Sequence, residues 1–156
     1  MKTYLTTRAY LTAYLLYRTR LMHKISLRQM HKYVDLKQST YAKIETGALK
    51  LTLDNFFTVL IMMGFTLTTY EEMLKKIDDV INEGIDETKP SLCVGISEDE
   101  EYNPSTMTEE EKARVEHTKD VRFFDDILGA VTTAKIDLLL AEHYAKGYEN
   151  HFAKKL

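Results

Sequence analysis

The side chains that most often carry catalysis or bind metals are poorly grouped in this sequence. His143 and His151, with Glu142 next to the first of them, do not have the spacing of metal ligands and lie near a fraying helix end. Asp125 and Asp126 are adjacent, so on a helix their carboxylates point in different directions. The sequence also lacks a glycine-rich phosphate loop and a nucleophile elbow. It therefore predicts no catalytic site, no metal site and no cofactor, and we do not expect an enzyme.

The basic side chains, in contrast, are concentrated in one part of the chain. Residues 1–50 contain ten Lys or Arg and two acids, whereas residues 51–156 contain eleven Lys or Arg and twenty-two acids. The formal net charge of the whole chain is -3. Because Lys and Arg release condensed counterions when they neutralise phosphates, a basic first third is typical of polyanion binders. The alternative is a small basic helical domain that binds no polyanion.

The elements that would position these basic side chains are helices. Apolar residues three and four apart predict an amphipathic helix over about residues 8–23. Ser26 stands where the N-cap of a short second helix belongs. A third helix over "KQSTYAKIET" would end at Gly47, which allows a left-handed turn.

Two more helices are predicted before residue 84. The stretch "LDNFFTVLIMMGF" predicts a thoroughly buried helix that ends at Gly64. Its core residues would be Phe56, Phe57, Met62 and Met63. Thr69 and Glu72 have the spacing of a capping box, which predicts a fifth helix over about residues 70–83.

The pattern changes after residue 83. Residues 84–107 contain both prolines and the acidic run "EDEE", and only "SLCVGI" could form a short strand. Helical patterns resume at Thr108, are interrupted at Gly129, and end with a last helix over about residues 132–147. We expect residues 84–107 to be an acidic linker.

Three short helices with a tight turn between the second and the third have the geometry of a helix-turn-helix. Residues 18–67 resemble the Xre, Cro and phage-repressor family through an Arg on the first helix, a Ser that opens the second, and "QSTYAKIETG" over the third. With the fifth helix, the resemblance covers about residues 10–83. It implies a five-helix domain whose third helix, residues 37–46, enters the major groove of DNA. Tyr41 stands where the family has a small aliphatic residue.

The resemblance also implies roles for individual residues. Gln38 would pair with adenine, and Lys43 would reach guanine or a phosphate. The other positions implied to contact DNA are Arg28, Lys37, Ser39, Thr40 and Lys50. Glu45 matches the family's glutamate that pairs with an arginine of the first helix, which is Arg20 in this sequence. That pair and Gly47 would be structural.

We therefore expect an all-α protein with a helix-turn-helix domain at residues 1–83, a linker at 84–107, and a C-terminal helical element at 108–156. The C-terminal element would form a homodimer contact or bind a protein partner. The predicted function is a sequence-specific, double-stranded DNA-binding transcription regulator, acting as a repressor or autoregulator on two half-sites. The alternative is a bifunctional phage or mobile-element protein, such as an antitoxin or an anti-CRISPR-like inhibitor. In that case the acidic C-terminal half would bind and inhibit a protein partner.

The sequence also bears on the location of the protein. No apolar run is long enough to span a membrane. Arg8, Thr12 and Arg18 interrupt the apolar start, so it does not resemble a signal peptide. Cys93 is the only cysteine, which excludes an intramolecular disulfide. We expect a cytoplasmic protein that does not contact a membrane.

Overall fold

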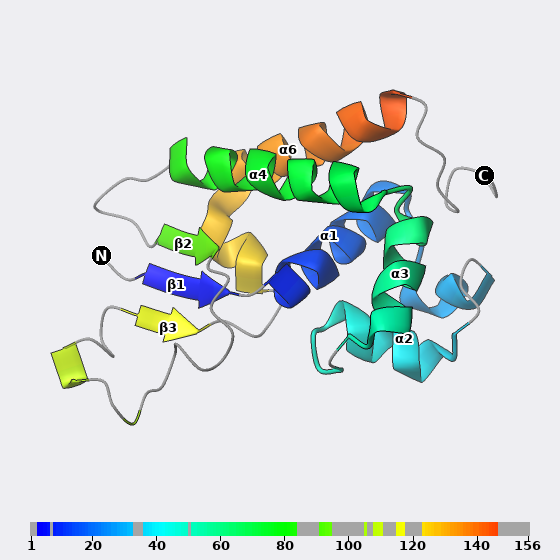
Figure 1. Ribbon diagram of the computed structural model, residues 1–156, viewed down its shortest axis with the longest axis horizontal. Helices are drawn as coiled ribbons and strands as arrows, with labels where there is room; N and C mark the ends of the chain where they lie inside the picture. The colour runs from blue at the N-terminus through cyan, green and yellow to red at the C-terminus, as the bar shows by residue number, and fades with distance from the viewer. Residues whose placement is uncertain are drawn as a thin grey trace.

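Helices and one small sheet make up the computed structural model, which describes residues 3–6, 8–32, 36–49, 51–83, 91–94, 105, 108–110, 115–117 and 123–146. The helices are α1 (Arg8–Met22), the 3-10 helix η1 (Leu27–Lys32), α2 (Gln38–Glu45), α3 (Leu53–Met62), α4 (Leu67–Glu83) and α6 (Phe123–Ala145). The strands are β1 (Thr3–Thr6), β2 (Ser91–Val94) and β3 (Val115–His117). Figure 1 shows α4 and α6 side by side, with the sheet at one end of the molecule and α2 and α3 at the other. No helix in the described residues is both long and apolar enough to cross a membrane.

The first three helical segments begin and end close to the predicted positions. The second segment, η1, is a 3-10 helix, and Ser26 caps it as predicted. The backbone N–H of Gln29 donates to Ser26 Oγ at 3.2 Å, and the backbone N–H of Ser26 donates to Gln29 Oε1 at 3.1 Å. Gly47 follows α2 with a φ of 77°, a left-handed conformation that favours glycine. Its N–H donates to the carbonyl of Ile44 at 3.1 Å, so the predicted C-terminal turn is confirmed.

The start of α4 differs from the prediction. Thr69 was expected to cap this helix, but α4 begins at Leu67 and Thr66 is the cap. The backbone N–H of Thr69 donates to Thr66 Oγ1 at 3.1 Å, and the backbone N–H of Thr66 donates to Thr69 Oγ1 at 2.8 Å. The two threonines therefore form a reciprocal capping box in which Thr69 takes the place of the usual Glu or Gln. The sequence does not distinguish the cap residue of α4, because the three threonines in "TLTT" have the same capping group.

A three-stranded parallel sheet accompanies the helices. The strand order is β2-β1-β3, and Thr3 pairs with Ser91 on one side and with Val115 on the other. The five α-helices in the described residues agree with the prediction of an all-α protein. The small sheet was not predicted. The fragment "SLCVGI" was the one predicted strand candidate, and β2 lies in it. The helix predicted from Thr108 is wrong at Val115–His117, because pairing with β1 overrides the local helical pattern there.

A glycine divides α6 into two helical segments, as predicted. Gly129 has φ 76° and ψ 169°, a combination that is available almost only to glycine. The hydroxyl of Thr133 donates to the carbonyl of Gly129 at 2.7 Å, so it binds a carbonyl exposed by the break. The longer segment after the break packs against α1 and α4.

One hydrophobic core connects α6 to the helices of the first 83 residues. Ile136 and Leu140 are fully buried in the same cluster as the apolar residues of α1, α3 and α4. The side chain of Arg18 in α1 also forms an ion pair with Asp137 in α6, with Nε 3.0 Å from Oδ1. In the described parts, β2 pairs with β1, and α6 shares the core of the first 83 residues. The division into residues 1–83, 84–107 and 108–156 stays a prediction.

The helix α3 is buried on one side only. Val59, Leu60 and Met62 are buried, and Met63 directly after the helix is also buried, as predicted. The prediction that Phe57 belongs to the core is wrong, because 41% of its surface is exposed. The apolar sequence of α3 thus exceeds what the described part of the chain can cover.

Candidate nucleic-acid interface

A buried ion pair fixes α2 against α1. Arg20 Nε lies 2.9 Å from each carboxylate oxygen of Glu45, and Arg20 Nη2 lies 2.6 Å from Oε1. Arg20 Nη1 also donates to the carbonyl of Ile25 at 2.8 Å, which holds the turn before η1. Both side chains are buried. Burial alone would lower the pKa of the Arg20 guanidinium, but the hydrogen bonds and negative charge of Glu45 outweigh it, and the pKa is raised. The structure thus brings together the two residues predicted as a structural pair.

The helix α2 has one buried and one exposed side. Its buried residues are Tyr41, Ile44 and Glu45. The exposed residues at its start and along its outer flank are Lys37, Gln38, Ser39 and Lys43, while Thr40 is half-buried. Five of the residues predicted to contact DNA therefore lie on or next to one short helix. Four of them have side chains open to solvent.

The start of α2 has no side-chain cap. Lys37 is the N-cap residue, with φ -60° and ψ 142°, and its side chain makes no capping hydrogen bond. The first amides of a helix have no partner within the helix, and they carry the positive end of its dipole. Lys37 adds a positive side chain at the same end. This end of α2 is therefore suited to an anion such as a phosphate.

The 3-10 helix η1 packs against α2 and adds one more predicted residue to the same region. Arg28 is exposed on η1, whereas Met30 is fully buried beneath it. Lys50, the remaining residue predicted to contact DNA, lies outside the described residues.

Tyr41 in α2 has a buried side chain that ends in a polar hydroxyl. Its side chain is almost fully buried, and within the described part of the chain its hydroxyl has no hydrogen-bond partner. Burial raises the pKa of this hydroxyl, and the nearby charge of Glu45 raises it further. The hydroxyl lies beside the charged pair of Arg20 and Glu45 but makes no hydrogen bond of ordinary geometry to a described residue, which is unfavourable for a buried polar group. The ring, by contrast, fills the space between α2 and the rest of the core.

Two of the residues considered for metal binding and catalysis, His143 and Asp125, have structural partners, and His151 lies outside the described residues. His143 is buried and stacks on Phe65, with 4.0 Å between the ring centroids. Its Nε2 lies 3.3 Å from the carbonyl of Met63. Asp125 accepts a hydrogen bond from the Tyr14 hydroxyl at 2.8 Å. Both side chains are therefore used to attach α6 to the rest of the protein.

Comparison with known proteins finds no matching family model, no similar curated protein and no similar solved structure.

Proposed function

We propose that this chain is a sequence-specific regulator that binds double-stranded DNA by placing α2 in the major groove. One observation carries the proposal: α2 buries Tyr41, Ile44 and Glu45 and presents Gln38 and Lys43 to solvent. An α-helix fits the width of the major groove, where its outer side chains can reach base edges. The proposal also requires a second copy of the chain, since one short helix covers too few base pairs for tight specific binding.

The chemistry of the exposed side of α2 suits this role. The Gln38 amide has a donor and an acceptor that can pair with the N7 and N6 atoms of adenine. The Lys43 ammonium can donate to guanine or to a phosphate. Lys37 and the first amides of α2 would bind a backbone phosphate, which fixes the register of the helix on the duplex.

The buried pair of Arg20 and Glu45 supports this proposal indirectly. It connects the end of α2 to α1 with charge-assisted hydrogen bonds, so the orientation of α2 is set by the core. A recognition helix has to be rigid, because its side chains must meet base edges within hydrogen-bonding distance. The basic composition of residues 1–50 favours phosphate contacts around the same helix.

The proposal can be tested by random-site selection with the purified protein, followed by affinity measurements on the selected DNA. We expect Gln38→Ala to weaken binding to the selected site by about 1–3 kcal/mol and to reduce discrimination at one base pair. Lys43→Ala should weaken binding and, where Lys43 contacts a phosphate, lower the salt dependence by about one counterion.

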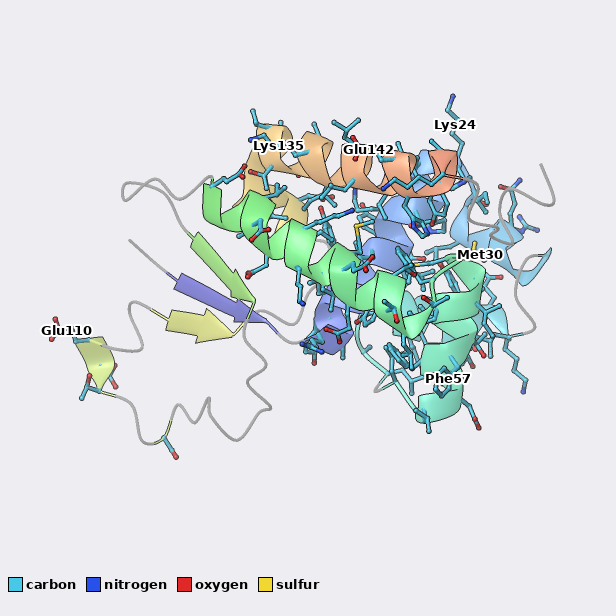
Figure 2. All side chains as sticks on the ribbon, turned by 45° about the horizontal axis from the view of Figure 1, so that its top comes forward. Lys24, Met30, Phe57, Glu110, Lys135 and Glu142 are labelled. Carbon is cyan, nitrogen blue, oxygen red and sulfur yellow. The ribbon has the colours of Figure 1, made fainter. Side chains whose placement is uncertain are left out.

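The matched control is Lys135→Ala. Lys135 is exposed on α6, and Figure 2 shows it well apart from Met30 in η1. Its replacement removes the same charge but should leave affinity unchanged. The proposal is wrong if the protein binds no DNA even at low salt. It is also wrong if Lys135→Ala weakens binding as much as Lys43→Ala does.

A further inference from the structure

A groove lies between the starts of α1, α3 and α4. Its volume is about 480 Å³, which is within the range of small-molecule sites in proteins. Its apolar lining comes from Leu51, Leu53, Phe56, Leu67 and Tyr70. An apolar space with a few polar groups close together is the usual form of such a site. The groove is therefore a candidate for binding a small molecule, and its polar groups determine which class of molecule fits.

One cation and one anion lie side by side in the lining of the groove. Arg8, the first residue of α1, forms an ion pair with Glu71 of α4. The two side chains are 43% and 44% exposed, so solvent reaches both charged groups. An ion pair as exposed as this one contributes little to the stability of a fold. Both charged groups are therefore available to a ligand at little cost to the protein.

Two hydroxyl groups of the groove are already used by the protein itself. Thr12 Oγ1 donates to the carbonyl of Arg8 at 2.7 Å, so the Tyr70 hydroxyl has to donate in its contact with Thr12. Thr12 and Tyr70 are both buried. Among the described contacts, both hydroxyl protons are thus taken. This inner part of the groove suits an apolar group of a ligand better than a polar one.

We propose that this groove binds a free α-amino acid with a large apolar side chain. The carboxylate of the ligand would bind the Arg8 guanidinium, and its ammonium group would bind the Glu71 carboxylate. Its side chain would lie among the apolar residues of the groove, where burial of apolar surface favours binding.

The contact between Arg8 and Glu71 selects among charged ligands. Because the two charges adjoin, the ligand also needs an anionic and a cationic group next to each other, as on the α-carbon of an amino acid. In a peptide the two charged ends are separated by at least one peptide unit. A ligand with a carboxylate alone would be repelled by Glu71, and an amine alone would be repelled by Arg8. A zwitterion leaves each of the four charges with an opposite partner.

This inference goes beyond the proposed function and does not depend on it. None of the described residues that line the groove is among those predicted to contact DNA. The test is carried out without DNA, so amino-acid binding and DNA binding can fail separately.

The experiment is isothermal titration calorimetry of the full chain with L-phenylalanine, L-leucine and L-tryptophan. We expect one ligand per chain, with a dissociation constant below about 1 mM for at least one of the three. Three matched ligands divide the contributions. Hydrocinnamate lacks the ammonium group of phenylalanine, phenethylamine lacks its carboxylate, and L-alanine keeps both charges without the large side chain. Each should bind at least about 10-fold more weakly than the best of the three amino acids.

Two variants test the charged pair. Arg8→Gln and Glu71→Gln should each weaken amino-acid binding by at least about 10-fold, because each removes the partner of one ligand charge. The matched control is Lys75→Gln. Lys75 is exposed on α4 and does not line the groove, so its replacement should leave the affinity unchanged.

Several results would overturn the inference. One is that none of the three apolar amino acids binds. Another is that hydrocinnamate or phenethylamine binds as tightly as L-phenylalanine, since the two charges would then not act together. A third is that Lys75→Gln weakens binding as much as Arg8→Gln does. The ligand series uses the unaltered protein, so it decides the question even where a variant fails to fold.

Discussion

Replacing Glu45 with alanine should destabilise the fold before it affects any contact with DNA. The side chain of Glu45 accepts three N–H···O contacts from Arg20, at 2.9, 2.9 and 2.6 Å, and both residues are buried. Its removal leaves a buried guanidinium that stays charged at any accessible pH and keeps its hydrogen bond to the Ile25 carbonyl. Breaking a buried pair in this way typically costs about 3–5 kcal/mol. This is a large share of the about 5–15 kcal/mol that stabilises an ordinary domain.

The assay is urea denaturation followed by circular dichroism at helical wavelengths. Glu45→Gln is a useful companion, because it keeps the shape of the side chain while it removes the charge and replaces one acceptor oxygen with an NH₂ donor. A double variant, Arg20→Met with Glu45→Leu, removes both charges and should recover much of the loss seen with Glu45→Ala. The free energies of unfolding of the single and double variants together give the coupling energy of the pair.

Two results would refute this reasoning. A loss below about 1 kcal/mol for Glu45→Ala would mean that the pair behaves like an exposed salt bridge. A double variant as unstable as the sum of the single variants would mean that Arg20 and Glu45 contribute independently. In either case the pair could not be what fixes the orientation of α2.

Three further predictions concern single residues. Tyr41→Phe should raise the free energy of unfolding by about 1 kcal/mol in urea denaturation, because it removes a buried hydroxyl that has no hydrogen-bond partner of ordinary geometry among the described residues; a loss of similar size would show that the hydroxyl is bonded to the nearby pair of Arg20 and Glu45. Gly129→Ala should lower the thermal midpoint and cost about 1–3 kcal/mol, since the positive φ strains any other residue, although an added Cβ would meet no described atom within 4 Å beyond the adjoining backbone. Burial lowers the pKa of His143 below its ordinary value. His143 therefore takes up a proton near pH 6.5 in the unfolded chain but only at lower pH in the folded chain. The free energy of unfolding should fall as the pH is lowered from about 7 to 5, and it should fall less steeply in His143→Phe.

The helices near the candidate interface could be predicted because their signals are local. The apolar spacing in α1, the Ser26 cap and Gly47 each involve residues within a few positions of one another. The match of Arg20 to Glu45 was implied by the family resemblance, and the structure places the two side chains in contact. The roles of Gln38 and Lys43 in binding DNA stay predictions.

The parts that could not be predicted depend on distant contacts. The pairing of β1 with β2 and β3 involves segments far apart in sequence, and Val115 lies within a pattern that locally favours a helix. The exposure of Phe57 could not be predicted either, because the apolar pattern of α3 is the same whether its outer side is covered or open. The single core shared with α6 became evident only from the packing of Ile136 and Leu140.

The order of strands in the sheet has a consequence for synthesis of the chain. Of the three strands, the central strand β1 is synthesised first. Thr3 can pair only after Ser91 and then Val115 have left the ribosome. At ordinary rates of translation this interval is about 5–20 s, which is long compared with the formation of the helices. During that time both edges of β1 are unpaired, and an unpaired strand can pair with the wrong chain. Ribosome-bound chains that end between β1 and β2 should therefore be the ones most prone to aggregate.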